Sequence, residues 1–271
     1  MTGALTMLNE FFQLEKPAAL MASQGTPDLG RLAQGLPAGG SMDPWAPVIL
    51  NRLLDLEDSF PVLELTLAGP VITAKCDVML ALGGLEGSLE SLPVWEPFHV
   101  RKGDTLNLRK IKGSSRLYLA ASTPAAGKRL RTLQGSSTLR QATCAPVHII
   151  ANPVFSDHFA LPTLRLSPQS DRRGLRLEAS GALPPGHEIP PEPMGYGAIQ
   201  MPPGGAPIIV GPDGPVTGGY ARIATVACAD LRRLAWLMPG QAVDLKPVSR
   251  DDAVRQYRHL EEALAQDLIP C

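Results

Sequence analysis

The chain has 271 residues, a formal net charge of −1 at pH 7 and a hydrophobic content of 44%. This length allows one large or two small domains, and a near-neutral chain offers no electrostatic basis for binding nucleic acid or an acidic membrane. The 26 glycines and 27 prolines, with only 5% aromatic residues, favour many short strands and turns over long helices.

We expect neither a zinc site nor a targeting segment. The four cysteines are far apart and form no Cys-x-x-Cys pair, and the five histidines form no His-Glu-x-x-His motif. The N-terminal stretch carries Glu10 and Glu15 and lacks a basic region, which argues against a signal peptide. No apolar run approaches the roughly 20 residues that a membrane span needs. These features favour a soluble, cytoplasmic protein without a membrane partner.

The first 122 residues have the pattern of a β-rich lobe. We expect residues 1–9 to be a frayed lead-in and residues 18–22 to be either a short strand or a helical turn. Glycine and proline interrupt residues 24–40 too often for regular structure, which predicts a loop. Alternating or continuous apolar runs predict strands at residues 11–14, 61–68, 97–100, 105–108 and 116–121, and either a strand pair or one long strand at residues 71–82.

One helix is predicted in this lobe, over residues 45–54. Asp43 is suited to cap the helix and Pro44 to occupy its first position. Trp45, Val48 and Ile49 have the spacing of an amphipathic face.

Residues 123–145 are small, polar and basic, which is typical of a linker. We therefore divide the chain into an N-terminal lobe of residues 1–122, this linker, and a C-terminal lobe of residues 146–271. A glycine turn precedes a strand near the end of each lobe, at residues 103–108 and 240–245. This weak similarity between the two segments suggests two similar lobes.

The second lobe is also β-rich, and residues 183–193 are expected to be a proline-rich loop. Short apolar runs predict strands at residues 147–151, 161–166, 174–177, 197–201, 206–210, 221–225 and 243–247. A short helix is predicted over residues 231–238. Ser249 and Asp252 form a capping-box-like start for a longer C-terminal helix.

The stretch from Tyr196 to Leu231 admits two interpretations. It can be an antiparallel meander of three strands joined by tight turns, which local chemistry alone favours. Alternatively, Thr217-Gly218-Gly219-Tyr220 forms a substrate loop, because adjacent glycines let backbone N–H groups approach an oxyanion and the two hydroxyls can orient it.

The same stretch resembles a known family. The runs GAIQMPP, PIIVGPDG, VTGGYARIATV and ADL are similar to the C-terminal part of the biotin-dependent carboxyltransferase family. That family includes the C subunit of 5-oxoprolinase and allophanate hydrolase subunit 2, and it is related to the carboxyltransferase domain of urea carboxylase. The resemblance implies a mainly β fold of two cyclophilin-like β-barrel lobes, with a few short helices and a C-terminal helix.

Other segments match the family's motifs with substitutions. Asp28-Leu29-Gly30-Arg31 and the following loop to Asp43 resemble the family's opening pattern. Ser170-Asp171-Arg172-Arg173-Gly174 resembles its Ser-Asp-Arg-Met-Gly run, with Arg173 in place of methionine. Pro191-Glu192-Pro193 stands where the family has Ser-Glu-Gly, so the carboxylate is retained between two prolines.

These motifs supply the candidate site. Arg31 or Arg172 would hold a substrate carboxylate, and Gly39 and Gly40 would present backbone N–H groups. The amides of Gly218 and Gly219 would polarise the ring carbonyl. Gln200 would hydrogen-bond an amide, and Asp43 would line the site as well as cap its helix. The predicted catalytic residues are Asp171, Asp213, Thr217 and Tyr220, with either Asp171 or Asp213 moving protons.

Structural alternatives stand beside these roles. Arg31 can simply pair with Asp28, Asp171 and Arg172 can lie in a solvated turn, and Asp213 can be an Asx-type turn residue. Gln200 can equally point to solvent.

The resemblance implies a subunit of an ATP-dependent 5-oxoprolinase-type complex, a hydrolase that opens 5-oxoproline to glutamate. Its partners would be a smaller carboxyltransferase-like chain, of the kind that forms the B subunit in this family, and a lactam-hydrolase subunit. No nucleotide motif is visible, so ATP would bind a partner or an unrecognised site. The alternatives are a biotin-dependent urea or amide carboxyltransferase subunit, with biotin carried by another chain, and a non-catalytic regulatory binding protein of the same fold.

Overall fold

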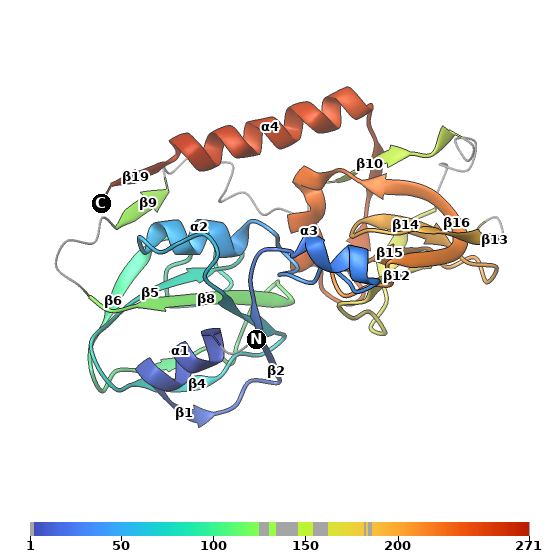
Figure 1. Ribbon diagram of the computed structural model, residues 1–271. Helices are drawn as coiled ribbons and strands as arrows, with labels where there is room; N and C mark the ends of the chain where they lie inside the picture. The colour runs from blue at the N-terminus through green and yellow to red at the C-terminus, as the bar shows by residue number, and fades with distance from the viewer. Residues whose placement is uncertain are drawn as a thin grey trace. The chain divides into compact units, whose positions relative to one another are not determined.

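The computed structural model describes residues 3–124, 130–133, 146–153, 162–181, 183 and 186–270 (Figure 1). Two compact units are formed. Unit 1 comprises Met1–Thr26, Asp43–Thr143 and Leu260–Cys271, and unit 2 comprises Pro27–Met42 and Cys144–His259. Segment 27–42 thus belongs to unit 2 although it lies early in the chain. The lobe boundaries that the sequence suggests, 1–122, 123–145 and 146–271, remain a prediction.

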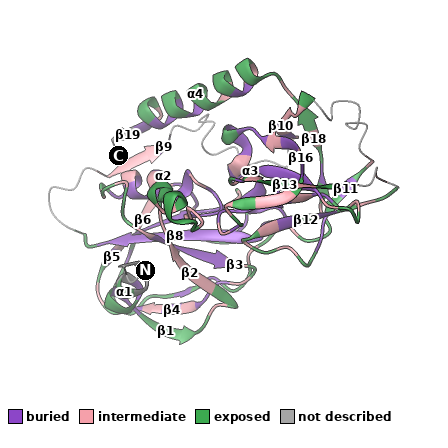
Figure 2. Ribbon diagram, turned by 45° about the vertical axis from the view of Figure 1, so that its right-hand side comes forward, coloured by how far each residue is buried: buried purple, intermediate pink, exposed green. Residues whose placement is uncertain are grey.

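Unit 1 is built on short antiparallel strands. A five-stranded sheet has the order β2-β3-β8-β5-β6, a three-stranded sheet the order β1-β4-β7, and β9 pairs with β19. The central strand β8 is buried along its whole length (Figure 2). The strands are β1 (Phe12–Lys16), β2 (Leu20–Gln24), β3 (Val62–Thr66), β4 (Val71–Ala74), β5 (Val78–Gly83), β6 (Pro97–Val100), β7 (Thr105–Asn107), β8 (Arg116–Ser122), β9 (Arg131–Leu133) and β19 (Leu268–Pro270).

Two helices accompany these strands, α1 (Gly3–Phe11) and α2 (Ala46–Leu53). Helix α2 confirms the predicted helix. The prediction of a frayed lead-in is wrong for residues 3–9, which belong to α1. Leu8 and Phe11 lie about one helical turn apart and are both buried, so their packing stabilises the helix. Within the predicted linker, the short strand β9 is described, and residues 125–129 and 134–145 lie outside the described part of the chain.

Unit 2 contains a nine-stranded sheet with the order β17-β11-β12-β15-β14-β16-β10-β18, and β13 pairs with β16. The two ends of this order, β17 and β18, are separated in the chain only by Asp244, so the sheet is nearly closed into a barrel. The strands are β10 (Val147–Ala151), β11 (Leu164–Leu166), β12 (Gly174–Ala179), β13 (Glu188–Pro193), β14 (Ala198–Met201), β15 (Ile208–Val210), β16 (Thr217–Val226), β17 (Ala242–Val243) and β18 (Leu245–Pro247).

The helical segments of unit 2 are short. They are η1 (Leu29–Gln34), η3 (Cys228–Asp230) and α3 (Leu231–Trp236). The longer α4 (Arg250–Gln266) begins in unit 2, and its residues from Leu260 onward belong to unit 1. It begins at the predicted capping box: Ser249 Oγ donates to Asp252 Oδ2 at 2.6 Å and accepts from the Asp252 N–H at 3.1 Å. No helix in the described ranges is long and apolar enough to cross a membrane.

The predicted mainly β fold is confirmed, with two corrections in unit 2. Residues 188–193 form strand β13 instead of a loop. Its prolines are tolerated because β13 lies at an edge and, among the described strands, pairs only with β16. The predicted meander is also wrong, because the strand order differs. Strand β14 lies between β15 and β16, whereas a meander would place β15 in the middle.

Candidate functional site

Segment 27–42 forms a closed loop in unit 2. The Asp28 N–H donates to the Ala38 carbonyl at 3.0 Å, which joins the two ends of the loop. Gly39 and Gly40 follow with φ values of 65° and 88°, a conformation that favours glycine. A Cβ on Gly40 would lie 2.9 Å from the Pro27 nitrogen, so a larger residue does not fit.

Arg172 ties this loop to the turn after β15. Its Nε and Nη2 donate to the two carboxylate oxygens of Asp213 at 2.7 and 3.1 Å, and Nη2 also donates to the Gly40 carbonyl at 2.6 Å. The Gly39 N–H donates to the Pro212 carbonyl at 3.1 Å. The Arg172 side chain is only 14% exposed. Three separately predicted motifs therefore meet here, which we call the Arg172 cluster (Gly40, Arg172 and Asp213).

The cluster changes what its members can do. Arg172 is engaged by Asp213 and Gly40, so its geometry suits positioning of the loop better than binding of a substrate. The Gly39 N–H donates to the Pro212 carbonyl, and the Gly40 carbonyl accepts from the Arg172 guanidinium. Gly39 and Gly40 therefore do not present the expected pair of N–H groups to an anion.

Asp171 lies outside this cluster, in an exposed turn. Its carboxylate accepts from the Arg173 N–H at 2.8 Å, the Arg173 guanidinium at 2.8 Å and the Gly174 N–H at 3.2 Å. Partial burial acts to raise the pKa of Asp171, but these hydrogen bonds outweigh it and the pKa is lowered. A turn-capping carboxylate with a lowered pKa is a weak general base.

Asp43 belongs to unit 1 and is fully buried. Its Oδ1 accepts from the Trp45 and Ala46 N–H groups at 2.8 and 3.3 Å, just before α2. The N-cap of α2 is Trp45, so the predicted start, with Asp43 as the cap and Pro44 at the first helical position, lies two residues too early. Its own N–H donates to the Tyr118 hydroxyl at 2.8 Å. Burial and, next, the charge of Glu64 raise the pKa of Tyr118 well above its usual value, so this hydroxyl stays neutral. These contacts give Asp43 a structural role.

Arg31 lies in η1, with Nη1 3.3 Å from where a Cβ on Gly39 would stand. The expected alternative was an ion pair with Asp28, but Asp28 Oδ1 accepts from the Gly30 N–H at 3.0 Å instead. Within the described part of the chain, the Arg31 guanidinium has no hydrogen-bond or ion-pair partner. It is therefore a cation available to a ligand.

A second group of polar side chains shares one face of the sheet around β16. Gln200 of β14 lies opposite Arg222, and Glu192 of β13 lies opposite Gly218. Because side chains alternate along a strand, Gly218, Tyr220 and Arg222 point to the same face. We call Glu192, Gln200, Gly218, Tyr220 and Arg222 the Gln200 face.

The Gln200 face contains a buried hydrogen-bond donor. Gln200 is 6% exposed, and its Nε2 has no hydrogen-bond partner among the described residues. A Cβ on Gly218 would lie 2.3 Å from that nitrogen and 3.0 Å from Met194 Cγ, so glycine makes room for both side chains. Glu192 and Arg222 form an ion pair at 3.4 Å beside them.

The predicted loop conformation of residues 217–220 is wrong, and their contact with substrate remains a prediction. These residues form the start of β16 and pair with β13, and neither Gly218 nor Gly219 has a positive φ. Thr217 is exposed and Tyr220 partly so. Gly218 leaves room for the Gln200 and Met194 side chains, and Tyr220 lies on the Gln200 face.

Met194 and Arg222 were not predicted as site residues. The two-residue alternation of the strand puts Arg222 on the same face as Tyr220, and this was the signal that could have added it. The contact of Gly218 with Gln200 and Met194 depends on strand order, which the local pattern does not contain.

The described residues show no site for a metal or a nucleotide of the expected kind. No group of three or more His, Cys, Asp or Glu side chains among them is placed to hold a metal ion. No helix in the same part of the chain begins at a glycine-rich loop that follows a strand, the usual cradle for nucleotide phosphates. The residues present therefore do not fit ATP in a Walker-type site.

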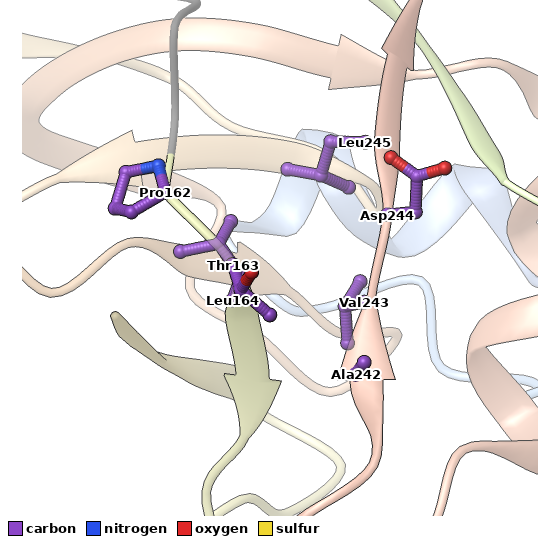
Figure 3. A pocket seen from close by; sticks show the side chains of 7 residues that line it. All are labelled: Pro162, Thr163, Leu164, Ala242, Val243, Asp244 and Leu245. Atoms are coloured by element: carbon purple, nitrogen blue, oxygen red, sulfur yellow. The ribbon is translucent and has the colours of Figure 1, made fainter. Parts of the chain in front are cut away.

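A cavity of about 260 Å³ lies apart from the predicted residues, where β11 meets the chain from β17 to β18 (Figure 3). Asp244 is the one charged residue among those that line the cavity. Its lining is Pro162, Thr163, Leu164, Ala242, Val243, Asp244 and Leu245.

Comparison with known proteins identifies a family. The model of the carboxyltransferase domain, subdomain A and B, matches residues 34–148 and 134–247. The 5-oxoprolinase C subunit of Escherichia coli (strain K12) is 28% identical over 200 residues, which cover 71% of this chain and 58% of that protein. The protein of the same name from Haemophilus influenzae is 28% identical over 287 residues, which cover 88% of this chain and 93% of that protein.

A solved structure shows the same fold. The urea amidolyase of K. lactis superimposes with a TM-score of 0.74 at 20% identity, over 96% of this chain and 21% of that one.

Proposed function

The chain belongs to the carboxyltransferase family with subdomains A and B, and we propose that it is a subunit of an ATP-dependent enzyme that opens 5-oxoproline to glutamate. Two relatives that are named as the C subunit of 5-oxoprolinase support this choice. The word subunit in their name also supports an assembly with partner chains, as expected for a smaller carboxyltransferase-like subunit and a lactam-hydrolase subunit.

The observation that carries the proposal is the buried, unpartnered Nε2 of Gln200. Leaving such a donor without an acceptor costs about 1–3 kcal/mol, so proteins retain one where a ligand supplies the acceptor. The carbonyl of a lactam is an acceptor of this kind, and a hydrogen bond to it favours attack by polarising the C=O bond. Gln200 would therefore bind the ring carbonyl.

Ring opening adds water across the amide bond. The carbonyl carbon gains an oxygen, the bond to nitrogen breaks, and the nitrogen takes up a proton. Glu192 and Tyr220 lie on the Gln200 face and can exchange protons there. Asp171 and Asp213, the carboxylates predicted for this role, are held by arginines at 2.8 and 2.7 Å, whereas the contact of Glu192 with Arg222 is longer, at 3.4 Å. We therefore assign proton transfer to the Gln200 face and a supporting role to the Arg172 cluster.

ATP would drive the reaction from a partner chain, since the described residues lack a fitting nucleotide site. Biotin, if the complex used it, would likewise come on a partner. No step assigned to Gln200, Glu192 or Tyr220 depends on either group being bound to this chain.

The test is reconstitution with the products of neighbouring genes. The purified complex is expected to release glutamate from 5-oxoproline only when ATP is present. Gln200→Ala should reduce the rate at least about 100-fold, because polarising donors of this kind contribute that much. Gln169→Ala is the control, since Gln169 is an exposed glutamine in the same unit.

Two outcomes would replace the proposal. Copurification of a biotinylated protein together with ATP-dependent carboxylation of urea or an amide would identify a carboxyltransferase subunit. A stable complex without either activity would identify a binding protein.

A further inference from the structure

Arg222 is the exposed cation of the Gln200 face, and its ion pair with Glu192 is weak. The Nε–Oε1 distance is 3.4 Å, and the side chains of Arg222 and Glu192 are 40% and 34% exposed. Water competes with both charges at this exposure, so such pairs typically contribute little to stability. A carboxylate from a ligand can therefore take the place of Glu192 at small cost.

The backbone under Arg222 is firmly held. The Asn152 Nδ2 donates to the Arg222 carbonyl at 2.9 Å, and Arg222 lies opposite Gln200 in the β14–β16 ladder. Directly opposite residues have Cβ atoms about 4.5–5.5 Å apart. A single small molecule can thus contact both side chains.

We propose that Arg222 binds the carboxylate of the substrate while Gln200 binds its amide carbonyl. The inference rests on the proposed function and narrows it. The ligand class is an amide that carries a carboxylate within a few bonds of the carbonyl, since the two donors are neighbours in the ladder.

The exchange also frees Glu192. The ligand carboxylate replaces the Glu192 carboxylate on Arg222, so Glu192 becomes available to the reacting amide. Strand β13 then loses one of its links to β16, its only strand partner in the described sheet. The Met194 backbone stays held, because its N–H donates to the Val216 carbonyl at 2.8 Å. Its flexible side chain, which lies beside Gly218, is therefore the group that must turn aside for the ligand to reach Gln200 Nε2. Binding of the carboxylate therefore prepares the site for the amide.

Other arginines of unit 2 are less suited to this task. Arg172 is held by Asp213 and the Gly40 carbonyl, and Arg173 is paired with Asp171 in an exposed turn. Arg31 is an available cation, but it has no described contact with the Gln200 face. Among these arginines, only Arg222 shares a face with the unpartnered amide donor.

The test is calorimetric binding to the purified chain, without ATP or partners. The two probes are 5-oxoproline and 2-pyrrolidinone, which has the same ring amide and no carboxylate. We expect Arg222→Met to weaken 5-oxoproline binding about 10- to 100-fold, the range for a charge-assisted hydrogen bond, and to leave 2-pyrrolidinone binding unchanged. Arg222→Lys should retain part of the affinity. Arg173→Met is the control and should bind both probes as the wild type does.

Three results would overturn the inference. They are unchanged 5-oxoproline binding by Arg222→Met, an equal loss for 5-oxoproline in Arg31→Met, and binding of neither probe by the wild type. The experiment is separate from turnover: Arg222-dependent binding without glutamate release would refute the proposed activity and support the assignment of Arg222.

Discussion

Replacing Gly211 by alanine should break the Arg172 cluster. A Cβ on Gly211 would lie 2.1 Å from the Arg172 carbonyl oxygen and 2.8 Å from its carbon, closer than real Cβ atoms come. Both contacts are with backbone, so no side chain can turn aside. The turn that carries Asp213 must therefore move away from Arg172.

The expected cost combines three effects. Overpacking of this kind typically costs about 1–3 kcal/mol. Two hydrogen bonds join the same segments, from the Gly211 N–H to the Arg173 carbonyl at 3.0 Å and from the Asp213 N–H to the Arg172 carbonyl at 3.2 Å. Their loss costs about 1 kcal/mol each. Alanine also lowers the conformational entropy of the unfolded chain, which stabilises the folded state by about 0.4–1 kcal/mol. The net expectation is a loss of roughly 2–4 kcal/mol.

Urea unfolding followed by circular dichroism measures this loss. Gly204→Ala is the matched control, because nothing lies within 4 Å of its Cβ position and its φ is not positive. That variant should be unchanged or more stable by up to about 1 kcal/mol. Equal stability of Gly211→Ala and the wild type would refute the close contact between the turn and Arg172.

Two further predictions concern Asp171 and the Gln200 face. The pKa of Asp171 is lowered in the folded chain, so its hydrogen bonds stabilise fully above the unfolded pKa of about 3.9 and are lost as the pH falls through the folded value. The stability difference between wild type and Asp171→Asn, from urea unfolding at several pH values, should therefore be constant from pH 7 to about 5 and shrink below about 4; an increase in acid would contradict this. Gly218→Ala should lower the activity of the reconstituted complex about 10-fold or more by displacing the Gln200 amide, whereas Gly219→Ala, with its nearest neighbour at 3.5 Å, should not; equal rates would refute the packing of Gln200 on Gly218.

Local patterns predicted the strands well, since alternation and apolar runs are properties of neighbouring residues. They could not predict which strands pair, because pairing joins distant segments. Arg172 donates to the Gly40 carbonyl 132 residues away, which no local pattern contains. The error over residues 188–193 has the same origin: prolines argue against a central strand, but an edge strand tolerates them.

The candidate site was predicted by residue type more than by geometry. Gln200 was expected to bind an amide or to point to solvent, and its burial excludes the second alternative. The glycine pair at 218–219 was expected to present N–H groups, yet Gly218 matters because Gln200 occupies the space of its missing Cβ. The room beside Gly218 is created by the packing of neighbouring strands, and the local sequence pattern does not show which strands are neighbours.

The central claim is that the Gln200 side-chain amide contacts the substrate. Its two N–H protons can be observed by nitrogen-15 NMR and assigned by their absence in Gln200→Ala. Titration with 5-oxoproline should shift these signals saturably, with the same dissociation constant that calorimetry gives. Calorimetric binding of 5-oxoproline with unmoved Gln200 signals would place the substrate elsewhere and contradict the claim.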